Sequence, residues 1–183
     1  GLYSRKFMSI KTIFLDRDGV INKEVDYLFK IKDFNFIDGV FEACKVFNKE
    51  GFEIIIITNQ SGIAKNLYSK EDFKILTGWM LNEFKSRNIK ILDVFYCPHE
   101  KNSNCHCRKP MPGMFLKAKK KYAIDMNKSW MIGDKESDIE AAKSAGISNT
   151  IIVRSGHKIQ ELNTKAKYKL DSIKDSQNII LKK

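Results

Sequence analysis

Short apolar runs alternate along the chain with longer segments in which apolar residues recur every three or four positions. The short runs occupy residues 12–15, 53–58, 91–96, 130–132 and 150–153, with a weaker one at 168–170. A strand that is apolar at every position is typical of a parallel sheet covered on both faces. The four consecutive isoleucines at 54–57 are the clearest case. The pattern therefore predicts five strands of a mainly parallel sheet and a short sixth strand in the polar tail.

The segments between these runs have helical periodicity and start and stop signals. Asp38 is expected to cap a helix that ends at Gly51, and Ser69 with Asp72 forms a capping-box pattern before the next one. A third helix is expected to start at Pro110 and Pro112. A fourth is expected to end at Gly146, and a weak fifth helix is expected at the end of the tail. Strands alternating with helices predict an α/β fold, a Rossmann-like three-layer sandwich with a mainly parallel sheet.

Length and composition fit one globular domain. The 183 residues are 43% hydrophobic and 30% charged, and no apolar run approaches the length of a membrane span. We expect a single domain over residues 8–183, and we interpret residues 1–7 as a remnant of expression or an upstream extension. No signal-peptide pattern is found, so a cytoplasmic protein with no membrane partner is expected.

The formal net charge of +11 has two interpretations. One is nucleic-acid binding, and the other is lysines on solvated helix faces, which we favour for the lysine run at 117–121. A positive field also favours any phosphorylated metabolite, so charge alone does not choose between DNA and a sugar phosphate.

Polar residues follow three of the predicted strands directly. Asp16 and Asp18 come after the first strand, Thr58 and Asn59 end the second, and Asp134 follows the fourth. Because ligands of open parallel sheets bind beyond the carboxyl ends of the strands, these side chains are expected to share one site. An isolated Asp-x-Asp-Gly is more often an ordinary turn. The prediction therefore rests on the polar residues at the ends of all three strands together.

The predicted chemistry is phosphoryl transfer. Asp16 would attack phosphorus and form an aspartyl-phosphate, while Asp18 would protonate the leaving oxygen and then activate water. Mg²⁺ would be held by the side chains of Asp16 and Asp134, with Asp18 contributing through its carbonyl. Developing charge would be stabilised by hydrogen bonds and cations from Thr58, Asn59, Arg108 and Lys109.

A second cluster lies in the loop 97–107, where three cysteines and two histidines fall within eleven residues. In a chain without a secretion signal this density indicates a metal before a disulfide. Three thiolates and one imidazole suit a closed tetrahedral zinc site of the structural kind, although scattered polar loop residues are the plainer alternative. The predicted ligands are Cys97, His99, Cys105 and Cys107. Zinc would fix the loop that aims the following Arg108 and Lys109 at the phosphate. His157, in the tail, is expected to be exposed and without a role.

These motifs resemble the haloacid dehalogenase-like phosphatases. Leu-Asp-Arg-Asp-Gly at 15–19 is similar to the family's first motif, Thr58 to its second, Lys109 to its third, and Gly133-Asp134 with Asp138 to its fourth. The resemblance covers residues 10–153. The chain has no room for a large cap domain between the motifs, so it implies an open site and specificity from short loops.

Within that family, the cysteine loop with Cys-Arg-Lys-Pro resembles the subgroup of heptose-bisphosphate and histidinol-phosphate phosphatases. The segments 58–64, 112–114 and 133–135 look more like the heptose enzymes. This resemblance implies removal of the C7 phosphate of D-glycero-D-manno-heptose 1,7-bisphosphate, on the route to ADP-heptose and lipopolysaccharide. Carried over by position, the implied substrate contacts are Glu24, Val25, Asp26, Tyr27, Thr58, Asn59, Gln60, Ser61, Arg108, Lys109 and Lys135.

Three other functions stay open at this point. They are a histidinol-phosphate phosphatase, a nucleic-acid end phosphatase and a non-catalytic zinc-bearing module. The chain offers no basic and aromatic groove pattern for single strands, which weighs against nucleic acid. We expect a monomer whose partner is a small phosphorylated sugar.

Overall fold

A single parallel sheet organises residues 9–182, which the computed structural model describes. Its strands are β1 (Thr12–Leu15), β2 (Glu53–Asn59), β3 (Asp93–Cys97), β4 (Trp130–Gly133), β5 (Asn149–Val153) and β6 (Tyr168–Leu170). They lie in the order β3-β2-β1-β4-β5-β6, and each neighbouring pair is parallel. The predicted α/β fold is confirmed. The predicted remnant or extension at residues 1–7 lies outside the described residues.

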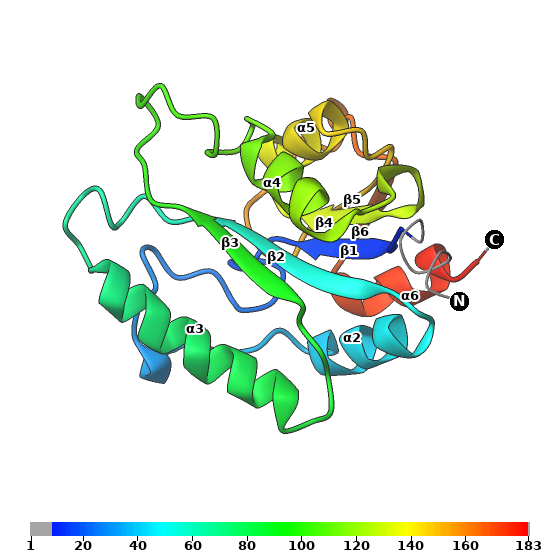
Figure 1. Cartoon of the computed structure of the whole chain (residues 1–183), viewed down its shortest axis with the longest axis horizontal. Helices are drawn as coiled ribbons and strands as arrows, with labels where there is room; N and C mark the ends of the chain where they lie inside the picture. The colour runs from blue at the N-terminus through cyan, green and yellow to red at the C-terminus, as the bar shows by residue number, and fades with distance from the viewer. Residues whose placement is uncertain (1–8, 183) are drawn as a thin grey trace.

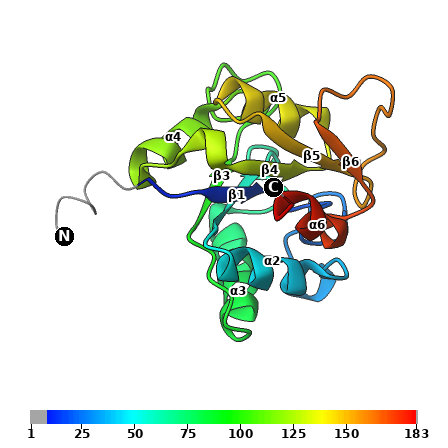
Figure 2. The same cartoon turned by 90° about the vertical axis from the view of Figure 1, so that its right-hand side faces the viewer.

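Helices cover both faces of the sheet, which gives three layers (Figures 1 and 2). One face carries α2 (Val40–Lys49), α3 (Lys70–Lys85) and α6 (Ser176–Ile180), and the other carries α4 (Gly113–Tyr122) and α5 (Glu136–Ser144). Short 3₁₀ turns lie at Ile31–Asp33, Met126–Lys128 and Ile173–Asp175. Within residues 9–182 no large cap domain stands over the sheet, as expected.

Alternate side chains of β1 enter different cores. Ile13 and Leu15 belong to the cluster on the side of α2 and α3, while Phe14 packs on the other side, 5.0 Å from the ring of Phe115 in α4. All three β1 side chains are fully buried. This two-sided burial explains why the strand is apolar at every position.

The predicted N-cap of the first long helix was wrong by one residue. The N-cap of α2 is Gly39, whose φ of 85° lies in the left-handed region, and Asp38 makes no cap. Asp38 is exposed and pairs instead with Lys174 at 3.2 Å. A side chain at position 39 would collide with Lys174, so glycine is required both by its φ and by this contact.

The expected capping box is confirmed, whereas Pro110 lies in a turn before α4, whose N-cap is Pro112. Ser69 and Asp72 exchange both hydrogen bonds of a capping box at the start of α3, at 3.0 and 2.9 Å. The buried face of that helix consists of Phe73, Leu76, Met80 and Phe84.

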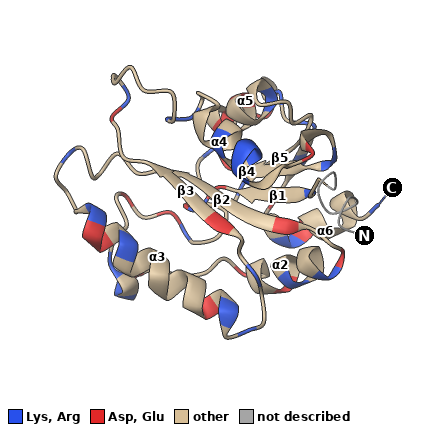
Figure 3. Cartoon of the chain, viewed as in Figure 1, with Lys and Arg blue, Asp and Glu red and all other residues tan. Residues whose placement is uncertain are grey.

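Charged residues are spread over the outer elements rather than gathered on one. Lysines are interleaved with Asp and Glu along α3, and the lysines of α4 at 117, 119, 120 and 121 are exposed to solvent (Figure 3). None of the helices in the described part of the chain is both long and apolar enough to cross a bilayer.

Candidate active site

The carboxyl end of β1 lies where the strand order reverses, between β2 and β4. Leu15 pairs with Ile56 on one side and with Ile132 on the other. Asp16 therefore leaves the sheet beside Thr58 and Asp134, because all three lie within two residues of that level. This crevice beyond the strand ends is where ligands bind in open α/β sheets.

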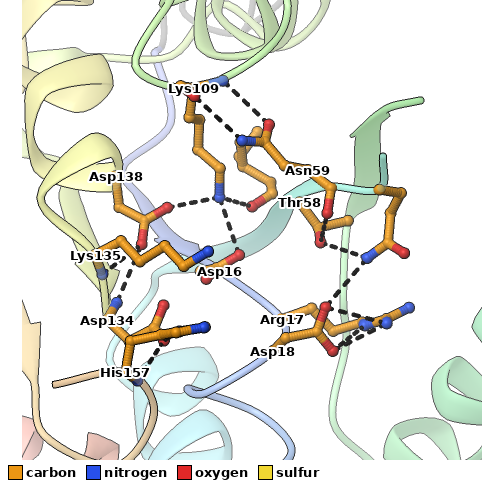
Figure 4. A network of polar contacts seen from close by, with 12 residues as sticks. Asp16, Arg17, Asp18, Thr58, Asn59, Lys109, Asp134, Lys135, Asp138 and His157 are labelled. Atoms are coloured by element: carbon orange, nitrogen blue, oxygen red, sulfur yellow. Dashed lines mark hydrogen bonds and ion pairs between the residues drawn. The ribbon is translucent and has the colours of Figure 1, made fainter. Parts of the chain in front are cut away.

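A buried lysine joins the acids at this crevice (Figure 4). The Lys109 ammonium contacts Asp16 Oδ1 at 2.9 Å and Asp138 Oδ1 at 2.6 Å, and donates to the carbonyl of Ile57 at 2.8 Å. Its residue is only 4% exposed. Burial alone would lower the pKa of Lys109, but Asp138 and Asp16 outweigh it and raise the pKa. The lysine is therefore a fixed cation beside the predicted nucleophile.

Three carboxylates meet around this cation, and only two of them were expected to hold a metal. Oxygens of Asp16, Asp134 and Asp138 lie within 4.8 Å of one another. Burial raises the pKa of Asp16 well above its usual range; Asp138 raises it further, and Lys109 opposes both. Burial and then Asp138 raise the pKa of Asp134 to about 6. So much buried negative charge is the environment in which a divalent cation is most stabilising.

The two carboxylate oxygens of Asp134 differ in their hydrogen bonding. Its Oδ2 accepts hydrogen bonds from the backbone and the ring of His157, at 3.0 and 2.7 Å, while its buried Oδ1 has no hydrogen-bond partner. An ionised oxygen that is buried without a partner is costly, and it fits a metal ligand. The expectation that His157 is exposed and has no role was wrong, because its ring holds this carboxylate in place.

Two glycines make room for Asp134. Any side chain at Gly19 or Gly156 would collide with the carboxylate, and Gly19 also has a φ of 88°. The hydroxyl of Ser155 donates to the carbonyl of Gly19 at 2.8 Å, which ties the two segments together. The segment 155–157, which follows β5, therefore closes the site on the side of Asp134.

Asp18 points away from the three clustered acids (Figure 4). Its carboxylate accepts three bonds from Arg17 at 2.9, 3.1 and 3.2 Å, and one each from Asn22 at 3.0 Å and Gln60 at 3.3 Å. The side chain of Arg17 is 2% exposed and that of Asp18 is 23% exposed. The carboxylate is therefore held rigidly at the cavity wall, a position suited to proton transfer.

Thr58 and Asn59 differ in what they can do. The buried hydroxyl of Thr58 accepts a bond from Gln60 at 2.8 Å. The amide of Asn59 instead exchanges two hydrogen bonds with the backbone of Lys109, at 3.1 and 3.2 Å. Asn59 therefore positions the loop that carries Lys109.

One cavity of about 500 Å³ opens above these groups. Its lining includes Asp16, Asp18 and all of the substrate contacts implied by the resemblance except Thr58. It also includes residues that the sequence did not single out as contacts, namely Lys65, Tyr68, Glu100, Lys101, Asp138 and His157. Asp138 was named in the sequence as part of the fourth motif but not as a contact, and nothing in the sequence pointed to Lys65.

The four predicted zinc ligands also converge, and their ligand atoms lie within 4.8 Å of one another. Cys97 Sγ is 3.8 Å from Cys105 Sγ, close to the edge of about 3.8 Å expected for a tetrahedron with metal–sulfur bonds of about 2.3 Å. Cys107 Sγ lies only 2.6 Å from Cys97 Sγ, which is shorter than that edge. Burial opposes the shift, but bonds from Ser103 and the backbone of Arg108 lower the pKa of Cys105 to about 6. This favours the thiolate, the form that binds metal. The group can therefore bind a metal ion.

The cysteine loop is coupled to the acids through its neighbours. The backbone of Gln60 donates to the carbonyl of Cys97 at 2.7 Å, and the guanidinium of Arg108 donates to that of His99 at 3.3 Å. Lys109 follows directly and reaches Asp16 across 93 residues of sequence. The position of the buried lysine therefore depends on the loop at 97–107.

The chain is similar to known phosphatases. Residues 106–176 match the HAD-hydrolase-like family model. The chain is 48% identical, over 83% of its length and 87% of the relative's, to a D-glycero-alpha-D-manno-heptose-1,7-bisphosphate 7-phosphatase of Photorhabdus laumondii. It is 42% identical, over 96% and 98%, to the corresponding beta-anomer enzyme of Vibrio cholerae.

A crystal structure is similar as well. It is that of the D,D-heptose 1,7-bisphosphate phosphatase of B. bronchiseptica complexed with magnesium and phosphate, with a TM-score of 0.84 and 26% identity over 94% of this chain and 98% of that one. The chain belongs to the heptose-bisphosphate phosphatases, a family of the haloacid dehalogenase-like hydrolases.

Proposed function

We propose that the protein removes the C7 phosphate of D-glycero-D-manno-heptose 1,7-bisphosphate through an aspartyl-phosphate intermediate, a step toward ADP-heptose. One observation carries the proposal: a single cavity has a nucleophilic acid paired with a buried lysine inside it and is lined by nearly all substrate contacts that the family resemblance implies. The names of the relatives support the heptose substrate.

The chemistry follows from the geometry of the acids. An oxygen of Asp16 attacks phosphorus, the bond between phosphorus and the C7 oxygen breaks, and Asp18 donates a proton to the departing oxygen. Water then attacks the phosphorus of the aspartyl-phosphate, and Asp18 takes up a proton from that water. The bond between phosphorus and Asp16 breaks, which releases inorganic phosphate and regenerates the Asp16 carboxylate. Lys109 lies 2.9 Å from Asp16 and balances the charge of the transferring group.

Two metals fit the residues present. Mg²⁺ would be held by Asp16 and Asp134, with the carbonyl of Asp18, and the partnerless oxygen of Asp134 supports this assignment. When bound, Mg²⁺ would supply positive charge that offsets the negative charge of the transferring phosphoryl group. Zn²⁺ would be held by Cys97, His99, Cys105 and Cys107, and its role is to fix the loop that carries Arg108 and Lys109.

The lining of the cavity also supports the substrate contacts that the family resemblance implies. Glu24 and Asp26 line it together with Ser61 and Lys135, so hydroxyl-binding and phosphate-binding groups face the same space. We expect the protein to act as a cytoplasmic monomer with no nucleic-acid partner.

The test is a panel of substrates with Mg²⁺. It compares kcat/KM for the alpha and beta anomers of the heptose bisphosphate with that for histidinol phosphate, because relatives of both anomer types are similar to the chain. We expect one heptose anomer to exceed histidinol phosphate by at least about 100-fold, since buried polar groups reject a substrate that leaves them unpaired. Faster turnover of histidinol phosphate would contradict the proposal.

A further inference from the structure

One cation at the cavity is held by an aromatic side chain instead of by an acid. The ammonium of Lys65 donates to the hydroxyl of Tyr27 at 2.7 Å and lies 5.0 Å from the centroid of its ring. Both residues are exposed and both line the cavity. Across residues 9–182 Lys65 forms no ion pair, so its charge is available to an anion.

The backbone around this pair is built to hold it. The amide of Lys65 donates to the carbonyl of Ser61 at 3.1 Å, and that of Ala64 donates to the carbonyl of Pro98 at 3.2 Å. Tyr27 has a φ of 54°, in the left-handed region that bulky residues rarely adopt. Backbone strain of this kind is commonly found where a side chain must be presented to a ligand.

Lys65 shares the cavity lining with a second cation. The hydrogen bond to Tyr27 raises the pKa of Lys65 and so favours its charged form. Arg108, which also lines the cavity, forms no ion pair with any described residue and donates only to a carbonyl. Two cations from different loops, after β2 and after the cysteine cluster, therefore line the same cavity.

The other lysines of the cavity are placed differently. Lys109 is already balanced by Asp16 and Asp138, and Lys135 extends toward the reacting acids (Figure 4). A bisphosphate brings a second dianion that the reacting acids and Lys109 do not engage. Its charge needs donors elsewhere along the cavity.

We propose that Lys65, oriented by Tyr27, is a specificity-determining residue that binds the phosphate that the enzyme does not remove, together with Arg108. This rests on the proposed function, because it presumes a substrate with two phosphates. Tyr27 is a positioning residue in this role: its oxygen and ring hold the ammonium where the second phosphate arrives.

The experiment measures how strongly the enzyme prefers a bisphosphate. For the full-length protein with Mg²⁺, the ratio of kcat/KM for heptose 1,7-bisphosphate to that for heptose 7-phosphate is compared among wild type, Lys65→Met, Tyr27→Phe and Lys74→Met. Lys74 is an exposed lysine of α3 that does not line the cavity, so its replacement matches the change in charge and size.

We expect Lys65→Met to lower this ratio about 10-fold, through a higher KM for the bisphosphate, since a charge-assisted hydrogen bond is lost. Tyr27→Phe keeps the ring but loses the oxygen, and should lower the ratio about threefold. Lys74→Met should retain the wild-type ratio. A wild-type ratio in Lys65→Met would overturn the proposal, as would an equal loss with both substrates.

Failure of the proposed function looks different. In that case the wild type itself turns over the heptose bisphosphate more slowly than histidinol phosphate. The role of Lys65 is then decided with fructose 1,6-bisphosphate and fructose 6-phosphate. A preference for the bisphosphate that falls in Lys65→Met supports the assignment, and the absence of any such preference in wild type overturns it.

Discussion

Replacing Lys109 by methionine tests whether this lysine holds the acids of the site together. The change keeps the length of the side chain but leaves Asp16 and Asp138 without their shared cation. At contact distances of 2.9 and 2.6 Å, each ion pair amounts to about 6 kcal/mol of Coulomb attraction at an effective dielectric constant of about 20. Desolvation of the ions offsets much of this, so we expect a net destabilisation of about 3–5 kcal/mol near pH 8.

The pH dependence of this loss identifies its cause. Without Lys109 the buried Asp16 keeps a folded-state pKa above that of the unfolded chain, where aspartate titrates at about 4. A raised folded pKa means that protonation favours the folded state, so the destabilisation is largest at high pH and shrinks as pH falls toward 4. Mg²⁺ should restore part of the stability at pH 8, because it supplies positive charge to the same acids.

The assay is urea unfolding of the wild type and the variant at pH 5 and pH 8, with and without Mg²⁺. Lys135→Met is the matched control: it removes an exposed lysine from the same cavity and should change stability by no more than about 0.5 kcal/mol. A loss in Lys109→Met that is equal at both pH values, or no larger than that of Lys135→Met, would refute the reasoning.

Three further outcomes follow from the site. Gly156→Ala should weaken Mg²⁺ binding at least about 10-fold, because the added methyl collides with Asp134; calorimetry measures this, and unchanged affinity would contradict the crowding argument. Mg²⁺ affinity should also fall about 10-fold per pH unit below pH 6, because the pKa of Asp134 is raised to about 6 and the proton must leave before the ion binds; a flat profile between pH 7 and pH 5 counts against this. Finally, zinc removal with Mg²⁺ restored should lower kcat/KM about 10-fold or more, as the loop that carries Arg108 loosens; full turnover by zinc-free protein would show that the loop does not need its metal.

The sheet and the acids at its edge could be predicted because the signals are local. Each central strand is a short apolar run, and Asp16 and Asp134 follow their strands directly. The parallel sheet then brings the strand ends together whatever the loops do. The four predicted zinc ligands could be recognised equally well from the sequence, since they fall within eleven residues, and they converge as expected.

The contacts that complete the site could not be predicted, because they join residues that the sequence separates. His157 reaches Asp134 across 23 positions, and Lys65 meets Tyr27 across 38. Lys109 was expected at the site, but its ion pair with Asp138 was not. No periodicity or spacing encodes such pairs, which arise only when the loops pack.

Local signals also failed where a tertiary contact competed with them. Asp38 is a good N-cap residue, yet the helix begins after Gly39. The left-handed turn at Gly39 and the contact with Lys174 decided the boundary.

The most direct test of the central claim follows both phosphates of one substrate at once. Heptose 1,7-bisphosphate is incubated with Mg²⁺ and the wild-type protein or Asp16→Asn, and the reaction is followed by ³¹P NMR. The account predicts that the C7 phosphate signal converts to inorganic phosphate, that the anomeric signal remains, and that Asp16→Asn leaves both signals unchanged. Loss of the anomeric phosphate, or turnover by Asp16→Asn at the wild-type rate, would contradict it.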